Sequence, residues 1–244
     1  MKRALVTCLL LGLCAPLLAA ALPAPAPPPA SSPSRIHASY DVLKAGMKIV
    51  TMSETFTRKH DRYEIESVSQ AVGLLAMFKA ETIRVTSSGT ITAHGLRPAA
   101  FASTRKVDAD RNASAEFDWE KHQITLNDRA GRRTLPLPAG TQDRLSAMYQ
   151  LMFLPLPDMQ VLKFYMTNGS KVDDYSYVIT HDQSVTVPLG TFKATYLATP
   201  PEKNATRTEI WVAAEHANFP YKLVITEPDG GQFTQVLTGF DVTP

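Results

Sequence analysis

Apolar and polar side chains alternate with a period of two residues along several stretches of this chain. In residues 62–66, Tyr63 and Ile65 fall on one face and charged side chains on the other, and residues 115–120 repeat the pattern. This period is typical of strands that pack one face and leave the other in solvent. Parallel sheets that are covered on both faces would show continuous apolar runs instead, so the sequence predicts antiparallel pairing.

Turn residues separate the alternating segments at short intervals. They include Ser88-Gly89, Ala130-Gly131, Asn168-Gly169 and Asp229-Gly230-Gly231. Tight turns between such segments are typical of antiparallel hairpins and meanders. The predicted fold is therefore mainly β: a strongly curved antiparallel sheet or open half-barrel of roughly ten or more strands.

One segment, residues 142–153, has helical spacing instead, and two prolines shortly after it would end a helix. The apolar positions at this spacing are Leu145, Met148, Tyr149, Met152 and Phe153. Further apolar residues widen the apolar arc beyond half a turn, so the helix needs cover on more than one side. We therefore expect one buried helix near residues 142–153, lying in the hollow of the curved sheet.

Two polar residues lie at the start of this helix. An acid in the first turn suits the helix dipole, so we favour this role for Asp143 over an ion pair with Arg144. Ser146 has no base near it in sequence, and we expect it to be solvated or bonded to backbone.

Residues 72–78 form a second apolar run, too short for periodicity to separate a helical turn from a buried strand. The strand-like composition that follows it favours a strand.

The first 35 residues have the composition of an export signal and a tether. Lys2 and Arg3 precede an apolar stretch that contains both cysteines, and small residues then offer a cleavage site near Ala21. A Pro-rich, uncharged segment follows. We expect a signal peptide at 1–21, a linker at 22–35 and a single β-rich domain at 36–244. The expected location is the periplasm, with an uncleaved anchor as the alternative.

The charge balance excludes some partners. The chain has 25 Lys and Arg against 23 Asp and Glu, and loss of Lys2 and Arg3 leaves 23 against 23. No basic block remains, which argues against nucleic acid. No second apolar run reaches membrane-spanning length, so we expect a protein that does not span the membrane after signal cleavage.

The sequence holds no motif for catalysis, metal binding or a cofactor. The six histidines show no metal-ligand spacing, and neither a nucleophile elbow nor a phosphate-binding glycine loop is present. The expected protein is therefore not an enzyme, with no catalytic residues, no metal and no cofactor.

Several short motifs resemble an exported bacterial family, domain of unknown function 3108, from about Ile36 to Phe240. They are Ser87-Ser88-Gly89-Thr90-Ile91, Gly95-Leu96-Arg97-Pro98, Phe117-Asp118-Trp119, Gly140-Thr141-Gln142-Asp143-Arg144-Leu145-Ser146, Pro188-Leu189-Gly190-Thr191-Phe192, Glu209-Ile210-Trp211-Val212-Ala213 and Phe219-Pro220-Tyr221. The resemblance implies an envelope location and a β-rich fold, and no activity. A sheet around a helix is also similar, at the level of fold alone, to the half-barrel of periplasmic lipoprotein carriers.

Two functions are compatible with this sequence. The first is binding of an apolar or amphipathic, lipid-like molecule in the hollow of the sheet. The residues expected to line that site are Leu145, Met148, Met152, Tyr175 and Tyr177. The second is a structural or accessory role in the envelope, through contacts with other envelope proteins and with a filled core. A lined cavity of several hundred cubic ångströms would favour the first.

Overall fold

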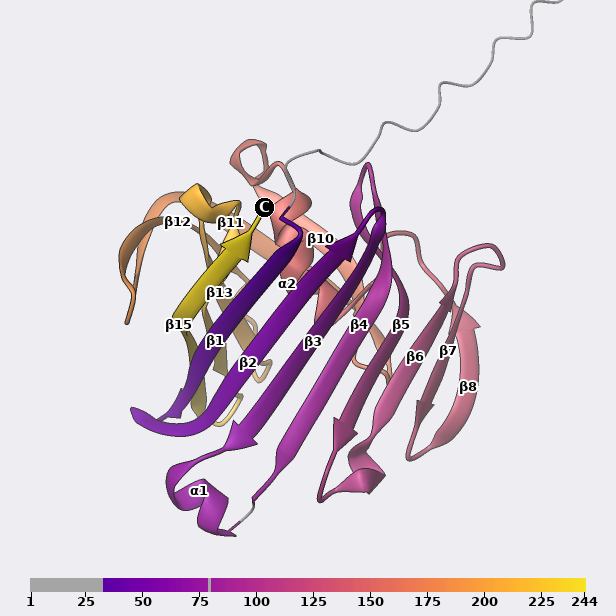
Figure 1. Cartoon of the computed structure of the whole chain (residues 1–244), viewed down its shortest axis with the longest axis horizontal. Coiled ribbons are helices and arrows are strands. Elements are labelled where there is room, and N and C mark those ends of the chain that lie inside the picture. Colours follow the sequence, from indigo (N-terminus) through magenta and orange to yellow (C-terminus); the bar gives the residue numbers. More distant parts are fainter. Residues whose placement is uncertain (1–32, 79) are drawn as a thin grey trace, which may run out of the picture.

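The computed structural model describes residues 33–78 and 80–244. The predicted signal peptide and nearly all of the predicted linker lie outside the described residues. The described part forms one sheet of fifteen strands in the order β8-β7-β6-β5-β4-β3-β2-β1-β15-β14-β13-β12-β11-β10-β9. Neighbouring strands are antiparallel except β9 and β10, and the sheet curves without closing into a barrel (Figure 1). The predicted fold class is confirmed.

The chain builds this sheet in two meanders. The first comprises β1 (Arg35–Lys44), β2 (Met47–Lys59), β3 (Arg62–Ala71), β4 (Thr82–Thr92), β5 (Gly95–Arg105), β6 (Ala113–Asp118), β7 (Gln123–Asp128) and β8 (Gly131–Pro136). The second comprises β9 (Gln142–Asp143), β10 (Val161–Thr167), β11 (Val172–Val187), β12 (Gly190–Ala198), β13 (Arg207–Ala213), β14 (Phe219–Thr226) and β15 (Gln232–Thr243). They join where β15 pairs with β1, so the crossover from β8 to the second meander must span the hollow.

The alternating segments form strands as predicted. Tyr63 and Ile65 on β3 are buried, as are Ala115 and Phe117 on β6. The burial of every second residue on these strands places the core on one face of the sheet, its concave side.

The crossover carries a short helix rather than the predicted twelve-residue one. Helix α2 (Ser146–Gln150) continues as the 3₁₀ turn η2 (Leu151–Phe153). Gln142 and Asp143 instead form strand β9. The carboxylate of Asp143 accepts hydrogen bonds from the backbone N–H groups of Leu145 and Ser146, at 2.9 and 2.8 Å, and the Oγ of Ser146 accepts from the N–H of Asp143. The helix therefore begins after Asp143, which orders its start as expected, while Ser146 is bonded to backbone.

The prediction for residues 72–78 is wrong. They form α1 (Gly73–Phe78), which connects β3 to β4. β3 already pairs with β4 up to Gln70 and Thr82, so the intervening residues have no neighbouring strand position to fill. Leu74, Met77 and Phe78 are 68%, 79% and 88% exposed. No helix among the described residues is long and apolar enough to cross a membrane.

Helix α2 is anchored to both meanders by one aromatic side chain. The ring of Tyr149 stacks on Phe56 of β2, with centroids 5.5 Å apart, and meets Phe219 of β14 edge-on at 5.6 Å. All three side chains are almost fully buried. Tyr149 therefore connects the helix to both meanders across the hollow.

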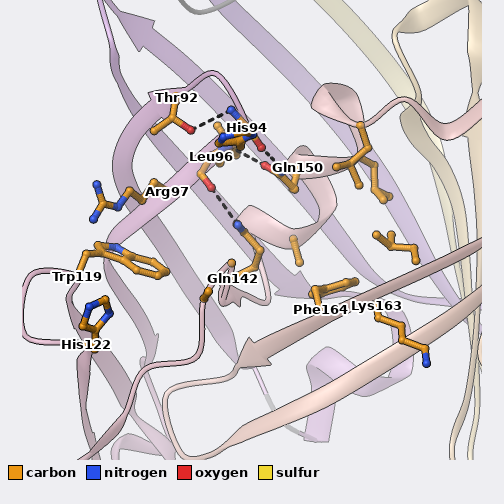
Figure 2. Close-up of a pocket in the computed structure, with 16 residues that line it drawn as sticks. Thr92, His94, Leu96, Arg97, Trp119, His122, Gln142, Gln150, Lys163 and Phe164 are labelled. Atoms are coloured by element: carbon orange, nitrogen blue, oxygen red, sulfur yellow. Dashed lines mark hydrogen bonds between the residues drawn. The ribbon is translucent and has the colours of Figure 1, made fainter. Parts of the chain in front are cut away.

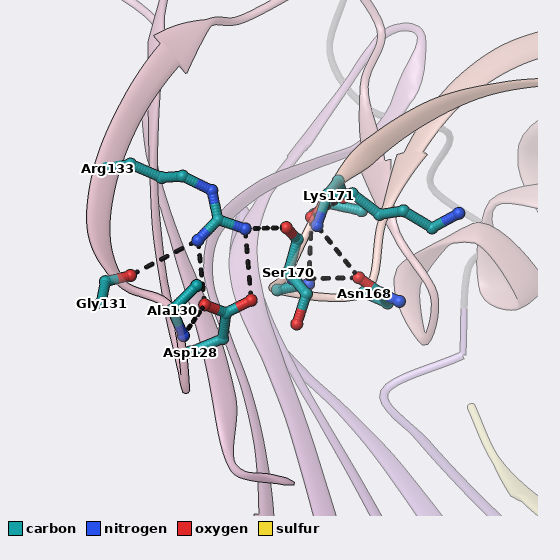
Figure 3. Close-up of polar contacts among 9 residues, drawn as sticks. Asp128, Ala130, Gly131, Arg133, Asn168, Ser170 and Lys171 are labelled. Carbon is teal, nitrogen blue, oxygen red and sulfur yellow. Dashed lines mark hydrogen bonds and ion pairs between the residues drawn. The ribbon is translucent and has the colours of Figure 1, made fainter. Parts of the chain in front are cut away.

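β8 pairs with β7 at one edge of the sheet, and polar contacts connect it to the other meander. The guanidinium of Arg133 on β8 pairs with the carboxylate of Asp128 at the end of β7, at 2.9 Å, and donates to the carbonyl of Ser170, in the turn between β10 and β11 (Figure 3). This pairing lowers the pKa of Asp128, chiefly through the side-chain hydrogen bond from Arg133. This contact connects β8, at one edge of the open sheet, to the turn between β10 and β11 in the second meander.

We predict that Tyr149→Ala lowers the free energy of unfolding by about 3–5 kcal/mol, because it removes a buried aromatic ring and leaves a cavity. Tyr165→Ala is the matched control, since Tyr165 on β10 is 42% exposed and should cost less than about 1 kcal/mol. Chemical denaturation measures both. Equal effects of the two substitutions would contradict the anchoring role of Tyr149.

We predict that Arg133→Gln raises amide hydrogen exchange along β8 several-fold while the melting temperature changes little, because a partly exposed ion pair at the end of a hairpin adds little global stability. Arg132→Gln is the control, since Arg132 pairs with Glu116 instead and is more exposed. Unchanged amide exchange along β8 in Arg133→Gln would show that the contacts of Arg133 do not stabilise this edge strand.

Candidate ligand-binding cavity

Helix α2 divides the hollow of the sheet between two cavities. The inner cavity has a volume of about 610 Å³ and is lined by residues of α2, of β1 to β4, and of β10, β11, β13, β14 and β15. The rim cavity has a volume of about 410 Å³ and lies between α2, β10 and the turns at the ends of β4 and β6. The wide apolar arc of the helix is explained by this position, because opposite sides of the helix line different cavities.

The inner cavity brings together four of the five residues predicted to line a site: Leu145, Met148, Tyr175 and Tyr177. The fifth, Met152, lies in η2, packs against the main core and lines neither the inner nor the rim cavity. The predicted helix continued regularly to residue 153, whereas the tighter 3₁₀ turn begins at Leu151 and changes which way the last residues face.

Small polar side chains make room for the inner cavity. Ser67 and Ser69 of β3 line it, directly opposite Glu54 and Met52 of β2 in the strand register. Larger apolar side chains at these two positions would fill the space between the sheet and Met148 of α2. The inner cavity therefore exists in part because small serines, and not large apolar residues, occupy the buried face of β3.

An acidic side chain lies on the wall of the inner cavity. Glu54 is 7% exposed, and its carboxyl accepts a hydrogen bond of 3.2 Å from the hydroxyl of Tyr149. Burial raises the pKa of Glu54 from 4.5 to about 7, against the lowering effects of hydrogen bonds from Ser67 and Tyr149 and of the charge on Arg144. At neutral pH the carboxyl of Glu54 is therefore neutral in a large fraction of the molecules and charged in the rest.

A cationic side chain borders the same cavity. Arg144 follows β9 directly, and its backbone N–H donates to the carbonyl of Thr167 at 3.0 Å. Arg144 is exposed where it lines the inner cavity, and desolvation by the surrounding protein lowers the pKa of Arg144. Its guanidinium makes no hydrogen bond or ion pair with any described residue.

The neighbouring acid, Asp143, is already satisfied. Its second carboxylate oxygen accepts from Ser87 Oγ at 2.6 Å, while the first accepts from the backbone at the start of α2. Desolvation by burial raises the pKa of Asp143, although each of these hydrogen bonds acts in the opposite direction. Asp143 therefore fixes the helix start to β4.

Two lysines also line the inner cavity, and both ammonium groups have partners. The Nζ of Lys171 pairs with Asp173 at 2.5 Å, and the Nζ of Lys222 lies 4.9 Å from the centre of the Trp211 ring. Arg144 is therefore the cavity-lining cation without a partner among the described residues.

The rim cavity is lined mostly by apolar and amide side chains (Figure 2). The amide of Gln150 accepts from the N–H of Leu96 at 2.6 Å and donates to the carbonyl of His94, while Gln142 donates to the carbonyl of Leu96. A side chain at Gly95 would collide with the Gln150 amide, and its φ of +96° also favours glycine. These contacts fix α2 to the turn between β4 and β5.

No group of three or more His, Cys, Asp or Glu side chains that could hold a metal ion is found in the described part of the chain.

Sequence reasoning missed Glu54 and the free guanidinium of Arg144. A signal for Glu54 was present: it occupies the inward phase of β2, between Met52 and Phe56, where apolar side chains are expected. An ionisable residue in the apolar phase of an alternating strand indicates either a partner or a cavity. Arg144 carried no such signal, because the direction in which its side chain points depends on where helix α2 begins.

The fold and these cavities define a class of protein: a curved, β-barrel-like sheet around a short helix. The chain belongs to the family described as a protein of unknown function (DUF3108), which matches residues 35–238. No curated protein sequence matches the chain.

A similar solved structure is a β-barrel-like protein of domain of unknown function DUF1849 from Brucella abortus. It is 12% identical with a TM-score of 0.55, and the match covers 86% of this chain and 98% of that one. At this identity the likeness shows the fold alone, and the β-barrel-like description is consistent with the expected fold-level resemblance to lipoprotein carriers.

We predict that stability falls as pH rises from about 4.5 through about 7 because of Glu54, whose folded pKa lies above its ordinary value. In this window the unfolded state has released the proton that the folded state keeps, so the destabilisation is absent below it and constant above it. The shift corresponds to about 3 kcal/mol at most. The difference between wild type and Glu54→Gln in urea unfolding should show this slope.

Glu64→Gln is the control for that measurement, because Glu64 lies on the exposed face of β3. Asp143 is present in both the wild type and Glu54→Gln, so the titration of Asp143 cancels in the difference between them. A flat difference curve between pH 4.5 and 7 would contradict the raised pKa of Glu54.

Proposed function

We propose that this protein is a non-enzymatic, exported protein of the periplasm that binds an apolar or amphipathic, lipid-like molecule in the inner cavity. The observation that carries the proposal is the cavity itself. Its volume of about 610 Å³ lies within the usual range of about 300–1,000 Å³ for small-molecule sites. The predicted signal peptide supports export, to a compartment where lipids must cross water.

The walls of the inner cavity suit an acyl chain. They combine Met148 of α2 with Tyr177 of β11 and with Leu223 and Ile225 of β14, which all offer apolar surface to the cavity. Burying ten methylenes contributes about 8 kcal/mol before the costs of association. Micromolar affinity needs about the same amount, so binding in this range requires a chain somewhat longer than ten carbons or further polar contacts.

The accessory role keeps one observation in its favour. The exposed side chains of Leu74, Met77 and Phe78 form an apolar surface on α1, of the kind that protein contacts use. This alternative needs no ligand, so a binding measurement separates the two functions.

We predict that a fluorescent fatty acid binds saturably to the purified protein, with a dissociation constant in the micromolar range or below. Met148→Trp should weaken this binding at least tenfold, because the larger ring occupies the cavity beside α2. Leu189→Trp is the matched control, since Leu189 is 43% exposed in the turn between β11 and β12, and it should bind as the wild type does.

Two outcomes would contradict the proposal. Absence of saturable binding by the folded wild type would favour the accessory role. Unchanged binding by Met148→Trp would place the fatty acid elsewhere than in the inner cavity.

A further inference from the structure

We propose that Arg144 holds the anionic headgroup of the ligand, so that the inner cavity selects an acyl chain that ends in a carboxylate or a phosphate. This inference rests on the proposed function and names the ligand class for the same cavity. It starts from the cavity wall, where Arg144 keeps accessible surface and its guanidinium makes no hydrogen bond or ion pair with a described residue.

Arg144 makes no ion pair with its nearest acid, although the charge of that acid favours the cationic form of Arg144. Asp143 is adjacent in sequence, but its two carboxylate oxygens are taken by Ser87 and by the backbone N–H groups of Leu145 and Ser146. Because this carboxylate is turned toward the helix start and β4, the guanidinium of Arg144 keeps its donors free of bonds to described residues.

Glu54 compensates the charge only in part. Its carboxyl is bonded to Tyr149, and burial raises the pKa of Glu54 to about 7. At neutral pH a large share of the molecules therefore has a neutral group at this position. Arg105 is a further cation whose charge acts unfavourably on Arg144, and it opposes the favourable charges of Asp143 and Glu54.

The other cations of the cavity are already partnered. Lys171 pairs with Asp173, and Lys222 lies over the Trp211 ring. A ligand anion that enters the cavity therefore meets Arg144 as the free cation among the described residues that line it.

The geometry of a guanidinium fits this role. Its planar fork of N–H donors matches the paired oxygens of a carboxylate or a phosphate, which a lysine ammonium does not do. Met148 and Tyr177 border the same space, so the apolar chain has a wall to pack against while its head meets Arg144. Both headgroups share this chemistry, and the experiment separates them.

The test is displacement of a neutral apolar dye, Nile red, by dodecanoic acid, dodecyl phosphate and dodecanol, three molecules with the same chain and different heads. For the wild type we expect at least one of the two anions to displace the dye at a concentration about tenfold or more below that of the alcohol, the equivalent of about 1.4 kcal/mol. Whichever anion displaces the dye more readily identifies the headgroup.

In Arg144→Gln the advantage of that anion over dodecanol should vanish while dodecanol still displaces the dye. Arg144→Lys should keep part of the advantage, because it retains the charge and loses the fork. Arg97→Gln is the control, since Arg97 borders the rim cavity over Trp119, and it should behave as the wild type does. If Arg144→Gln does not fold, the wild type and Arg144→Lys still decide the question.

Equal displacement by acid, phosphate and alcohol in the wild type would overturn the headgroup assignment and leave the proposed function standing. A preference for the anion that persists in Arg144→Gln would also overturn it. Failure of all three molecules to displace the dye would instead contradict the proposed function.

Discussion

The structure depends on the contact of Tyr149 with Phe56 and Phe219. The fifteen strands of the described residues form a sheet that does not close and leaves a hollow between its meanders, and the hollow collapses or fills with water unless something spans it. Tyr149 spans it, because its ring meets one meander through β2 and the other through β14. Helix α2 is thereby fixed between the meanders although it is only five residues long, too short to be stable by itself.

Once α2 is fixed, the space around it is set by the size and charge of the residues that face it. Serines on β3 leave the inner cavity unfilled, and Glu54 and Arg144 put ionisable groups on its wall. An apolar residue in place of Glu54 would give a more stable core, since a buried charge is costly. Departures from simple core packing concentrate at functional sites, and this one coincides with a cavity of ligand size.

The sequence predicted the features that depend only on residues within a single strand. Alternation at Tyr63 and Ile65 identified a strand and its buried face, because the period of two acts within a few residues. The start of α2 was placed too early, since Gln142 and Asp143 are drawn into β9 by pairing with β10, about twenty-four residues further along the chain. The exposed helix α1 was missed because apolar composition alone does not indicate burial. Met152 was assigned to the site because the predicted helix had no 3₁₀ end.

The position of Arg144 also fixes which part of the molecule a ligand would disturb. Arg144 and Leu145 lie between β9 and α2, while Gln150 at the end of α2 and Gln142 of β9 are bonded to Leu96 at the start of β5. These hydrogen bonds use backbone groups of β5 that do not line the inner cavity, so an anion at Arg144 leaves them intact. A headgroup there pairs with a guanidinium that has no partner among the described residues, and the binding of the ligand should stabilise the folded state. Helix α2 can therefore keep its position when the ligand binds in the inner cavity.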